Sequence, residues 1–368
     1  MIKKGHFKNK MLVGVMSVYM LIMFSACILK PSDEYSDSER RKLQQFPEVS
    51  SESLLNGEFM TDFESYTLDQ FPLREMFRRI KSYTALYGFM HQDNNGIYIS
   101  DGYASAMEYP LNEKSLEHAV RRFRKVYDMY ISGKDISAYY TVIPDKNYFM
   151  AEQSGHLSFD YEEFYNKIND DIEFMQYIDI RPLLDLEDYY RTDTHWRQEK
   201  IVDVAEFIGQ KMGVSLNGTY QRYELDNPFY GVYYGQAALP MNPETIYYLM
   251  SDDMESCNVF DFQNNREIEV YDLEKAYGKD PYEIYLSGPL SLITIENPNA
   301  DNDKELIMFR DSFGSSLAPL LIDGYSKITL VDIRYISSEM LGRFIEFDNQ
   351  DVLFVYSTLV LNNSETIK

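Results

Sequence analysis

The sequence is poor in cysteine. It has two, Cys27 and Cys257, and Cys27 lies in an apolar stretch near the N-terminus. The rest of the chain keeps one thiol and can form no internal disulfide, which excludes a small disulfide-stabilised scaffold. An apolar core must hold the fold, and roughly 340 residues suffice for one large α/β domain or two smaller ones.

Positive charge is also scarce. The chain has 35 Lys and Arg residues against 59 Asp and Glu, and the first thirty residues hold five of the lysines and no acid. The remainder therefore carries a formal charge of −29, which excludes binding to nucleic acid or to an anionic surface through bulk electrostatics. The five histidines form no Cys/His cluster with zinc-ligand spacing, so neither a metal nor another cofactor is expected.

One stretch without any charge runs from Met11 to Leu29, just long enough to span a bilayer. Residues 1–10 are basic and the following chain is acidic, so the positive-inside rule predicts a cytoplasmic segment at 1–10, a transmembrane anchor at 11–29, and the remainder outside the cell. A lipoprotein signal is the alternative, because small residues precede Cys27, which would then carry a lipid. In both cases the external part is tethered to the cell membrane.

Periodicity divides the external part into a helical stalk or arm at 30–90 and a main domain at 91–368. Short apolar or β-branched runs predict strands at 97–99, 138–143, 178–180, 305–309, 327–331 and 352–356. Amphipathic spacing predicts helices at 111–130, 161–177, 197–212 and around 337–345. This alternation indicates a mostly parallel sheet covered on both faces. Residues 213–300, rich in tyrosine and poorly periodic, are interpreted as an insertion that shapes a substrate cleft.

The sole tryptophan follows a histidine in Asp193-Thr194-His195-Trp196. An aspartate that accepts the Nδ1–H of an imidazole fixes its tautomer and leaves Nε2 free to take a proton from a nucleophile. This segment is predicted to lie on a loop that opens a helix. The alternatives are a structural His195 and an Asp193 that caps the helix from Arg197. We interpret Trp196 as a packing neighbour of the His195 loop.

A nucleophile follows the predicted strand at 305–309, in Arg310-Asp311-Ser312-Phe313-Gly314. His195 could activate the Ser312 hydroxyl, with Asp193 behind it. The helix after Ser312 would point N–H groups at an oxyanion. The alternative is that Asp311 and Ser312 only cap that helix.

Two cationic residues, Lys146 and Arg334, follow the predicted strands at 138–143 and 327–331. Both lie at the sheet edge where ligands bind in open α/β folds. Lys146 could hold a polar substrate group, or it could belong to a solvated turn. Arg334 could position a carbonyl or carboxylate, or it could pair with Asp332 or Asp311.

These motifs resemble the DHHW family of Firmicutes, which is related to the alginate O-acetyltransferase proteins of the SGNH-hydrolase superfamily. The similarity runs from about Tyr35 to Leu361. It is carried by Asp193-Thr194-His195-Trp196, Arg310-Asp311-Ser312-Phe313-Gly314, Ser38-Glu39-Arg40-Arg41-Lys42-Leu43, Phe46-Pro47-Glu48, Tyr66 with Asp69-Gln70-Phe71-Pro72-Leu73-Arg74, Pro144-Asp145-Lys146 and Asp332-Ile333-Arg334-Tyr335. Thr194 departs from the second histidine of the family name and is closer to the alginate proteins.

The resemblance implies a flavodoxin-like three-layer α/β/α SGNH-type domain that moves acetyl groups onto a cell-surface polysaccharide. It also implies that Ser312 is the nucleophile, His195 the base and Asp193 its partner, with a membrane-bound O-acyltransferase as acetyl donor. We expect the Ser312 N–H to bind the oxyanion.

Four further residues are candidates for oxyanion or substrate contacts: Gly288, Arg334, Lys146 and Arg310. An acetyl esterase of the same fold is one alternative to the transferase. A non-catalytic scaffold or glycan-binding protein of exopolysaccharide assembly is another.

Overall fold

A computed structural model describes residues 2–36 and 38–368, with side chains from residue 8 onward. The chain forms two compact units, one up to His91 and one from Gln92 to Lys368. Each unit is described by itself.

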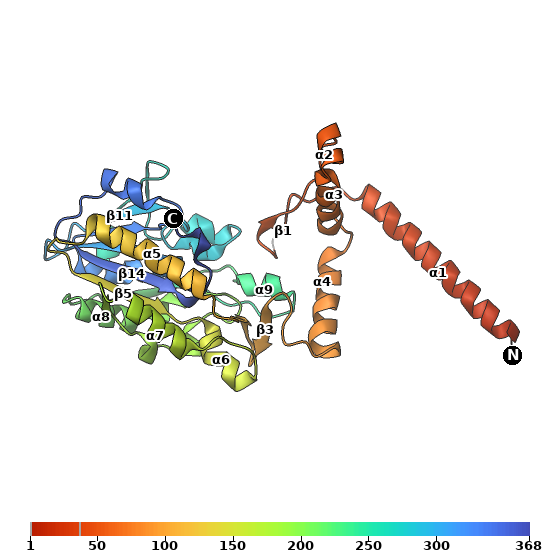
Figure 1. Ribbon diagram of the computed structural model, residues 1–368, viewed down its shortest axis with the longest axis horizontal. Helices are drawn as coiled ribbons and strands as arrows, with labels where there is room; N and C mark the ends of the chain where they lie inside the picture. The colour runs from red at the N-terminus through yellow and green to blue at the C-terminus, as the bar shows by residue number, and fades with distance from the viewer. Residues whose placement is uncertain (1, 37) are drawn as a thin grey trace. The chain divides into compact units, whose positions relative to one another are not determined.

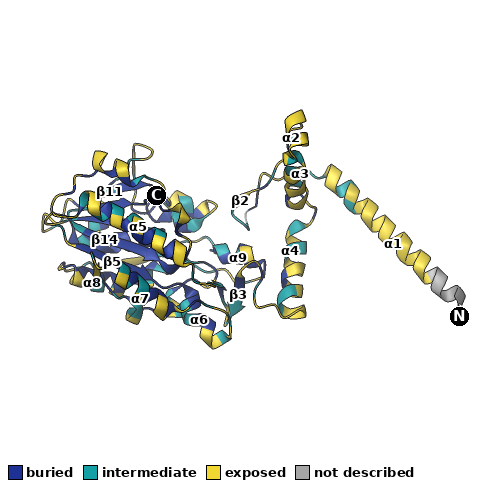
Figure 2. Ribbon diagram, viewed as in Figure 1, coloured by how far each residue is buried: buried dark blue, intermediate teal, exposed yellow. Residues whose placement is uncertain are grey.

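The N-terminal unit begins with α1 (Ile2–Leu29). Its segment Lys8–Leu29 is long and apolar enough to cross a membrane, and none of it is buried in protein (Figure 2). This helix fits both an anchor and a signal segment.

The rest of this unit is an arm made mostly of short helices. Its elements are β1 (Tyr35–Ser36), β2 (Arg41–Lys42), α2 (Ser51–Leu55), α3 (Glu58–Asp69), α4 (Arg74–Tyr83) and a π-helical turn η1 (Thr84–Gly88). Arg41 donates two hydrogen bonds to Asp69, at 2.6 and 2.8 Å. These bonds lower the pKa of that carboxyl. Phe46 packs edge-on against Phe63, with ring centroids 5.9 Å apart.

An eight-stranded sheet organises the second unit (Figure 1), in the order β10-β9-β11-β13-β12-β14-β5-β6. Its strands are β5 (Ala138–Ile143), β6 (Gln176–Tyr177), β9 (Asn258–Asp261), β10 (Arg266–Ile268), β11 (Leu292–Glu296), β12 (Glu305–Arg310), β13 (Lys327–Val331) and β14 (Asp351–Ser357). The five strands from β13 to β6 are parallel, and the three at the other edge pair antiparallel. The predicted mostly parallel sheet is therefore confirmed.

Alternate residues of the parallel strands enter two separate cores, one on each face. Leu306 and Met308 point to one core, while Ile307 and Phe309 point to the other. Because side chains alternate along a strand, apolar residues at every position give a sheet that must be covered on both sides. One face is covered by α5 (Glu113–Tyr130) and α7 (Tyr161–Asp171), and the other by α8 (Val202–Lys211) and η7 (Ala318–Gly324). This is the expected three-layer α/β/α arrangement.

Shorter elements connect these layers. They are β3 (Ile97–Ser100), β4 (Tyr103–Ala106), α6 (Lys146–Ser154), η2 (Arg181–Leu183), η3 (Leu186–Asp188), η4 (Gln198–Lys200), β7 (Gln221–Glu224), α9 (Val232–Ala237), β8 (Tyr247–Met250), α10 (Asp252–Ser256), η5 (Leu273–Tyr277), η6 (Pro281–Ile284), α11 (Phe313–Leu317), η8 (Ser338–Arg343), α12 (Thr358–Asn362) and η9 (Ser364–Thr366).

Five sequence-based expectations need correction. The helix placed at 161–177 ends at Asp171, and Gln176–Tyr177 form a strand. The strand placed at 178–180 lies at Gln176–Tyr177, the helix expected from 197 starts as an α-helix at Val202, and the helix around 337–345 is a 3₁₀ segment. Residues 213–300 are not wholly an insertion, because β9, β10 and β11 extend the central sheet. Only the part before β9 and the loops around η5 and η6 lie outside the sheet.

Candidate active site

The site forms where two loops meet at the carboxyl ends of the parallel strands. One loop, residues 190–195, precedes the turn of η4. The other is the turn from β12 into α11, which carries Ser312. Parallel strands bring their carboxyl ends to one edge, so residues 117 positions apart come into contact.

Ser312, His195 and Asp193 form a continuous chain of hydrogen bonds. His195 Nε2 lies 2.7 Å from Ser312 Oγ, and His195 Nδ1 lies 2.6 Å from Asp193 Oδ1. Asp193 and His195 are buried, while Ser312 is only half-buried. The structure thus brings together the three residues proposed from sequence, with the hydroxyl at the open end.

Both oxygens of Asp193 are bound. The His195 main-chain N–H donates to Oδ1 at 3.1 Å, and the Val232 N–H donates to Oδ2 at 2.8 Å. Asp193 therefore does not cap the helix from Arg197; it holds the imidazole and is itself held by the start of α9.

Gly231 allows this contact with α9. A Cβ atom at Gly231 would lie 2.3 Å from the carbonyl of Thr192 and from the nitrogen of Asp193. Its φ of −69° suits any residue, so close approach, and not backbone conformation, requires glycine here. No sequence pattern marks this position as part of the site.

Asp311, and not Ser312, caps α11. The Asp311 carboxylate accepts the Phe313 N–H at 3.0 Å and both the N–H and hydroxyl of Ser357 at 2.8 and 2.7 Å. The Ser312 side chain makes no capping bond. The capping alternative therefore accounts for Asp311 and leaves Ser312 Oγ free for His195.

Trp196 connects the His195 loop to the turn that follows Ser312, as expected for a packing neighbour. Its fully buried indole donates to Phe313 O at 3.2 Å and to Ser316 Oγ at 2.9 Å. The Ser316 hydroxyl also lies 2.8 Å from the Tyr282 hydroxyl.

Tyr282 covers the imidazole. Its ring stacks on that of His195, with centroids 3.9 Å apart and planes 9° from parallel. A ring face stabilises a cation above it, so this contact would favour an imidazolium at His195. The sequence indicated only a tyrosine-rich region and did not single out Tyr282.

One main-chain donor is available for an oxyanion. Within the described residues the Ser312 N–H has no acceptor, whereas the Phe313 N–H is bonded to Asp311. The expected contribution of the following helix is therefore small. The Gly288 N–H donates to Tyr285 O at 3.2 Å, so the expectation of an oxyanion donor at Gly288 is wrong.

Arg310 and Arg334 share Asp332. Arg334 donates to both oxygens of Asp332, at 2.9 and 2.6 Å, and its side chain is 15% exposed. Its Nη1 has no hydrogen-bond partner in the described part of the chain and remains a candidate for substrate contact. Arg310 is 1% exposed and points at the carbonyls of Gly288 and Leu290. Burial lowers its pKa, and the expectation that Arg310 contacts substrate is wrong.

Lys146 is 2% exposed, so the alternative of a solvated turn is wrong. Its ammonium donates to Tyr190 O at 2.8 Å and to Arg191 O at 3.3 Å. It therefore binds the 190–195 loop and does not face a substrate. Burial lowers the pKa of Lys146 to about 7, although the charges of Glu244, Asp193 and Asp145 act in the opposite direction.

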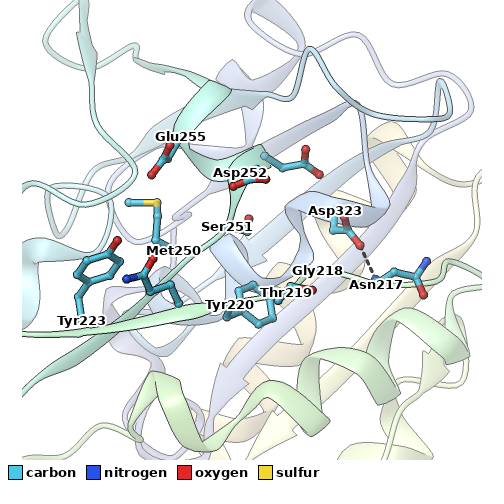
Figure 3. Close-up of a pocket in the computed structure, with 12 residues that line it drawn as sticks. Asn217, Gly218, Thr219, Tyr220, Tyr223, Met250, Ser251, Asp252, Glu255 and Asp323 are labelled. Carbon is cyan, nitrogen blue, oxygen red and sulfur yellow. Dashed lines mark hydrogen bonds between the residues drawn. The ribbon is translucent and has the colours of Figure 1, made fainter.

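A separate hollow of about 600 Å³ lies at the other edge of the sheet (Figure 3). It is lined by Asn217, whose N–H donates to Asp323, and by the acidic residues of α10. Asp323 shortly precedes β13 and Ser312 follows β12, so this hollow is separate from the candidate site at Ser312. Among the described residues no group of His, Cys, Asp and Glu could hold a metal ion.

Two solved structures share this fold, and a third matches the chain more weakly. A DHHW family protein from Eubacterium siraeum is 20% identical, with a TM-score of 0.61 over 75% of this chain and 95% of that one. PatB1 of Bacillus cereus is 18% identical, with a TM-score of 0.57 over 74% and 98%. The O-acetyltransferase domain of Pseudomonas putida AlgJ is 10% identical, with a TM-score of 0.45 over 73% and 92%.

No sequence-family model and no curated protein sequence matches the chain. The similarity to the DHHW protein confirms, at the level of the fold, the resemblance carried by the sequence motifs.

Proposed function

We propose that the protein is an O-acyltransferase that moves an acetyl group through Ser312 onto a hydroxyl of a cell-surface polysaccharide. The hydrogen-bonded chain of Ser312, His195 and Asp193 carries this proposal. An isolated serine hydroxyl is inert at neutral pH, and a neighbouring imidazole oriented by a carboxylate is what activates it.

In the first half-reaction, His195 Nε2 takes the Ser312 proton while Oγ attacks the carbonyl carbon of the acetyl donor. The Ser312 N–H binds the oxyanion, and Tyr282 faces the imidazolium. The imidazolium then gives its proton to the leaving group, which departs and leaves acetyl-Ser312.

In the second half-reaction, His195 takes the proton of an acceptor hydroxyl as its oxygen attacks the acetyl carbon. Collapse of the oxyanion expels Ser312 Oγ, which recovers a proton from the imidazolium. The product is an O-acetyl ester and the free serine.

The apolar helix α1 supports a membrane-tethered enzyme whose main unit lies outside the cell. In that location the acceptor would be an envelope glycan. A membrane-bound O-acyltransferase would deliver the acetyl group, as the resemblance implies.

Turnover of p-nitrophenyl acetate by the full chain in detergent micelles tests the proposal. We expect release of p-nitrophenol that Ser312→Ala lowers at least about 100-fold. Ser326→Ala, at the opposite edge of the sheet, should leave the rate unchanged. Equal turnover by the wild type and Ser312→Ala would reject an enzyme acting through Ser312 and favour a scaffold or glycan-binding protein.

A glycan acceptor separates transfer from hydrolysis. Oligosaccharides from bacterial envelope glycans should raise the rate and become acetylated, as mass spectrometry would detect. Turnover that gives only acetate with every acceptor would instead identify an acetyl esterase.

A further inference from the structure

Two consecutive peptide groups, from Tyr190 to Thr192, lie just before Asp193. The side chains of Lys146 and Glu244 each bind both of them. Lys146 Nζ donates to Tyr190 O at 2.8 Å and Arg191 O at 3.3 Å. On the other side, Glu244 Oε1 accepts the Arg191 N–H and Oε2 accepts the Thr192 N–H, each at 2.8 Å.

These bonds fall on the same peptide units. The unit joining Tyr190 to Arg191 has its carbonyl on Lys146 and its N–H on Glu244, and so does the unit joining Arg191 to Thr192. Because a peptide is planar and its C=O and N–H point in opposite directions, a cation on one side and an anion on the other fix its rotation. Two such units in a row leave the chain entering Asp193 little freedom.

The two charged groups come from elements far apart in sequence. Lys146 begins α6, directly after β5, and Glu244 lies between α9 and β8. Glu244 also accepts the Thr192 hydroxyl at 2.8 Å, and its main chain exchanges hydrogen bonds with Phe229 at 2.8 and 2.9 Å. The clamp therefore ties the loop to the parallel sheet on one side and to the segment before β8 on the other.

The burial of Lys146 is costly for stability. No carboxylate of the described residues lies within ion-pair distance of its ammonium, which is satisfied by carbonyl oxygens alone and packs over the Tyr233 ring at 4.9 Å. Burying an ammonium without a direct counter-ion disfavours folding. A buried lysine that lowers stability but binds the loop of the proposed triad is expected where function requires it.

We propose that Lys146 and Glu244 are paired positioning residues, which clamp the 190–192 main chain and thereby hold Asp193 and His195 in line with Ser312. This inference rests on the proposed function of Ser312. Neither residue touches the reacting atoms, and both act through the loop.

The test compares Lys146→Met, Glu244→Gln and the double variant with the wild type, all as full chains in detergent micelles. Each single variant should lower kcat for p-nitrophenyl acetate between about 10- and 100-fold with KM nearly unchanged. Phenylmethylsulfonyl fluoride should modify Ser312 more slowly by a similar factor. The double variant should lose little more than the worse single variant, because loss of either side already frees the peptide that joins Tyr190 to Arg191. In every variant Arg191 O keeps its hydrogen bond from the Ala104 N–H, at 2.8 Å.

Milder variants and control variants show whether Lys146 and Glu244 position the loop or only stabilise the fold. Glu244→Ala should fall below Glu244→Gln, whose amide oxygen still accepts one N–H. The surface pair Lys167 and Glu113, joined at 2.6 Å, provides controls in Lys167→Met and Glu113→Gln, which should keep wild-type kcat. If Lys146→Met does not fold, the kcat of the milder variant Glu244→Gln tests the proposal by itself.

The two hypotheses can fail independently. If Ser312→Ala removes turnover but Glu244→Gln and Lys146→Met keep kcat and sulfonylation within about twofold, the clamp is rejected and the function stands. A lower melting temperature with unchanged kcat would likewise reduce Lys146 and Glu244 to structural residues. If Ser312→Ala changes nothing, the function itself is rejected.

Discussion

Gly231 packs closely against the backbone of the 190–195 loop, and this makes it a sensitive position. In Gly231→Ala the new methyl group would meet backbone atoms of Thr192 and Asp193 at 2.3 Å, so one of the two segments must move. We expect kcat to fall at least about 100-fold because Asp193 loses the Val232 N–H. Esterase assays on the purified variant would measure this loss.

Gly218→Ala is the matched control for Gly231→Ala. Its Cβ would lie 3.1 Å from the Tyr220 hydroxyl, the end of a side chain that can rotate away. Activity of Gly218→Ala should stay close to that of the wild type. Full activity of Gly231→Ala would mean that the contact with α9 does not position Asp193.

Sequence chemistry predicted the three members of the candidate triad and the packing role of Trp196, but not the other groups that hold them in place. An acid, an imidazole and a hydroxyl must each be a particular residue type, so Asp193, His195 and Ser312 leave a pattern. The donor to Asp193 Oδ2 is a main-chain N–H, 39 residues away, which any residue type supplies. Tyr282 and Glu244 are ordinary residue types in an irregular segment, and only the folded chain brings them to the loop.

At the scale of elements, the parallel strands were predictable because they are apolar on both faces. The observed β5 matches the expected range, and β12 and β13 agree to within one residue. Strands β9, β10 and β11 were missed because they are short and lie in a region without clear periodicity. Their place in the sheet depends on antiparallel partners that the local sequence does not specify.

Glu108 links the segment before α5 to α12, and its titration should be visible in stability. Asn362 donates to its carboxylate at 3.0 Å. Burial, followed by the nearby charge of Asp145, raises the pKa of Glu108 to about 7. In the unfolded chain this pKa is near 4.5, so the folded state binds more protons between these pH values. The stabilising contribution is present below about pH 4.5 and is lost as pH rises through about 7.

Glu108→Gln should remove this dependence, because an amide keeps the bond to Asn362 without ionising. Between pH 5 and pH 8 the wild type should lose on the order of 2 kcal/mol more unfolding free energy than the variant. Urea unfolding of both proteins at several pH values would measure the difference. Parallel pH curves would show that Glu108 ionises normally in the folded state.

At the scale of the whole molecule, the apolar helix α1 and the net charge bear on the same question, namely which surfaces the protein contacts. The chain carries a net charge of −24 and an apolar helix at one end. A strongly acidic main unit repels anionic lipid and polymers of the same sign. We therefore expect acceptors that are neutral or weakly charged, and we expect contact with the membrane through α1.

Cys27 distinguishes the two kinds of tether. With an uncleaved anchor, Cys27→Ser should remain in the membrane fraction at full length after an alkaline wash, because nineteen uncharged positions from 11 to 29 still span the bilayer. Fractionation and intact mass after expression in a bacterial host would measure this. If the mass of the wild-type protein corresponds to a chain that starts at a lipid-modified Cys27, and Cys27→Ser lacks this modified form, the lipoprotein alternative would be established.

The contact of Gly231 and Val232 with the Asp193 loop has a consequence for protein engineering. The irregular segment between α8 and β9 resembles an exchangeable specificity module, yet its main chain supplies a bond on which the proposed base depends. A chimera that imports this segment from a relative must keep Glu244 and the entry into α9. Without these contacts the chimera would lose activity, and a change in the acceptors it uses could not be measured. Variation is better directed to side chains that take no part in these contacts.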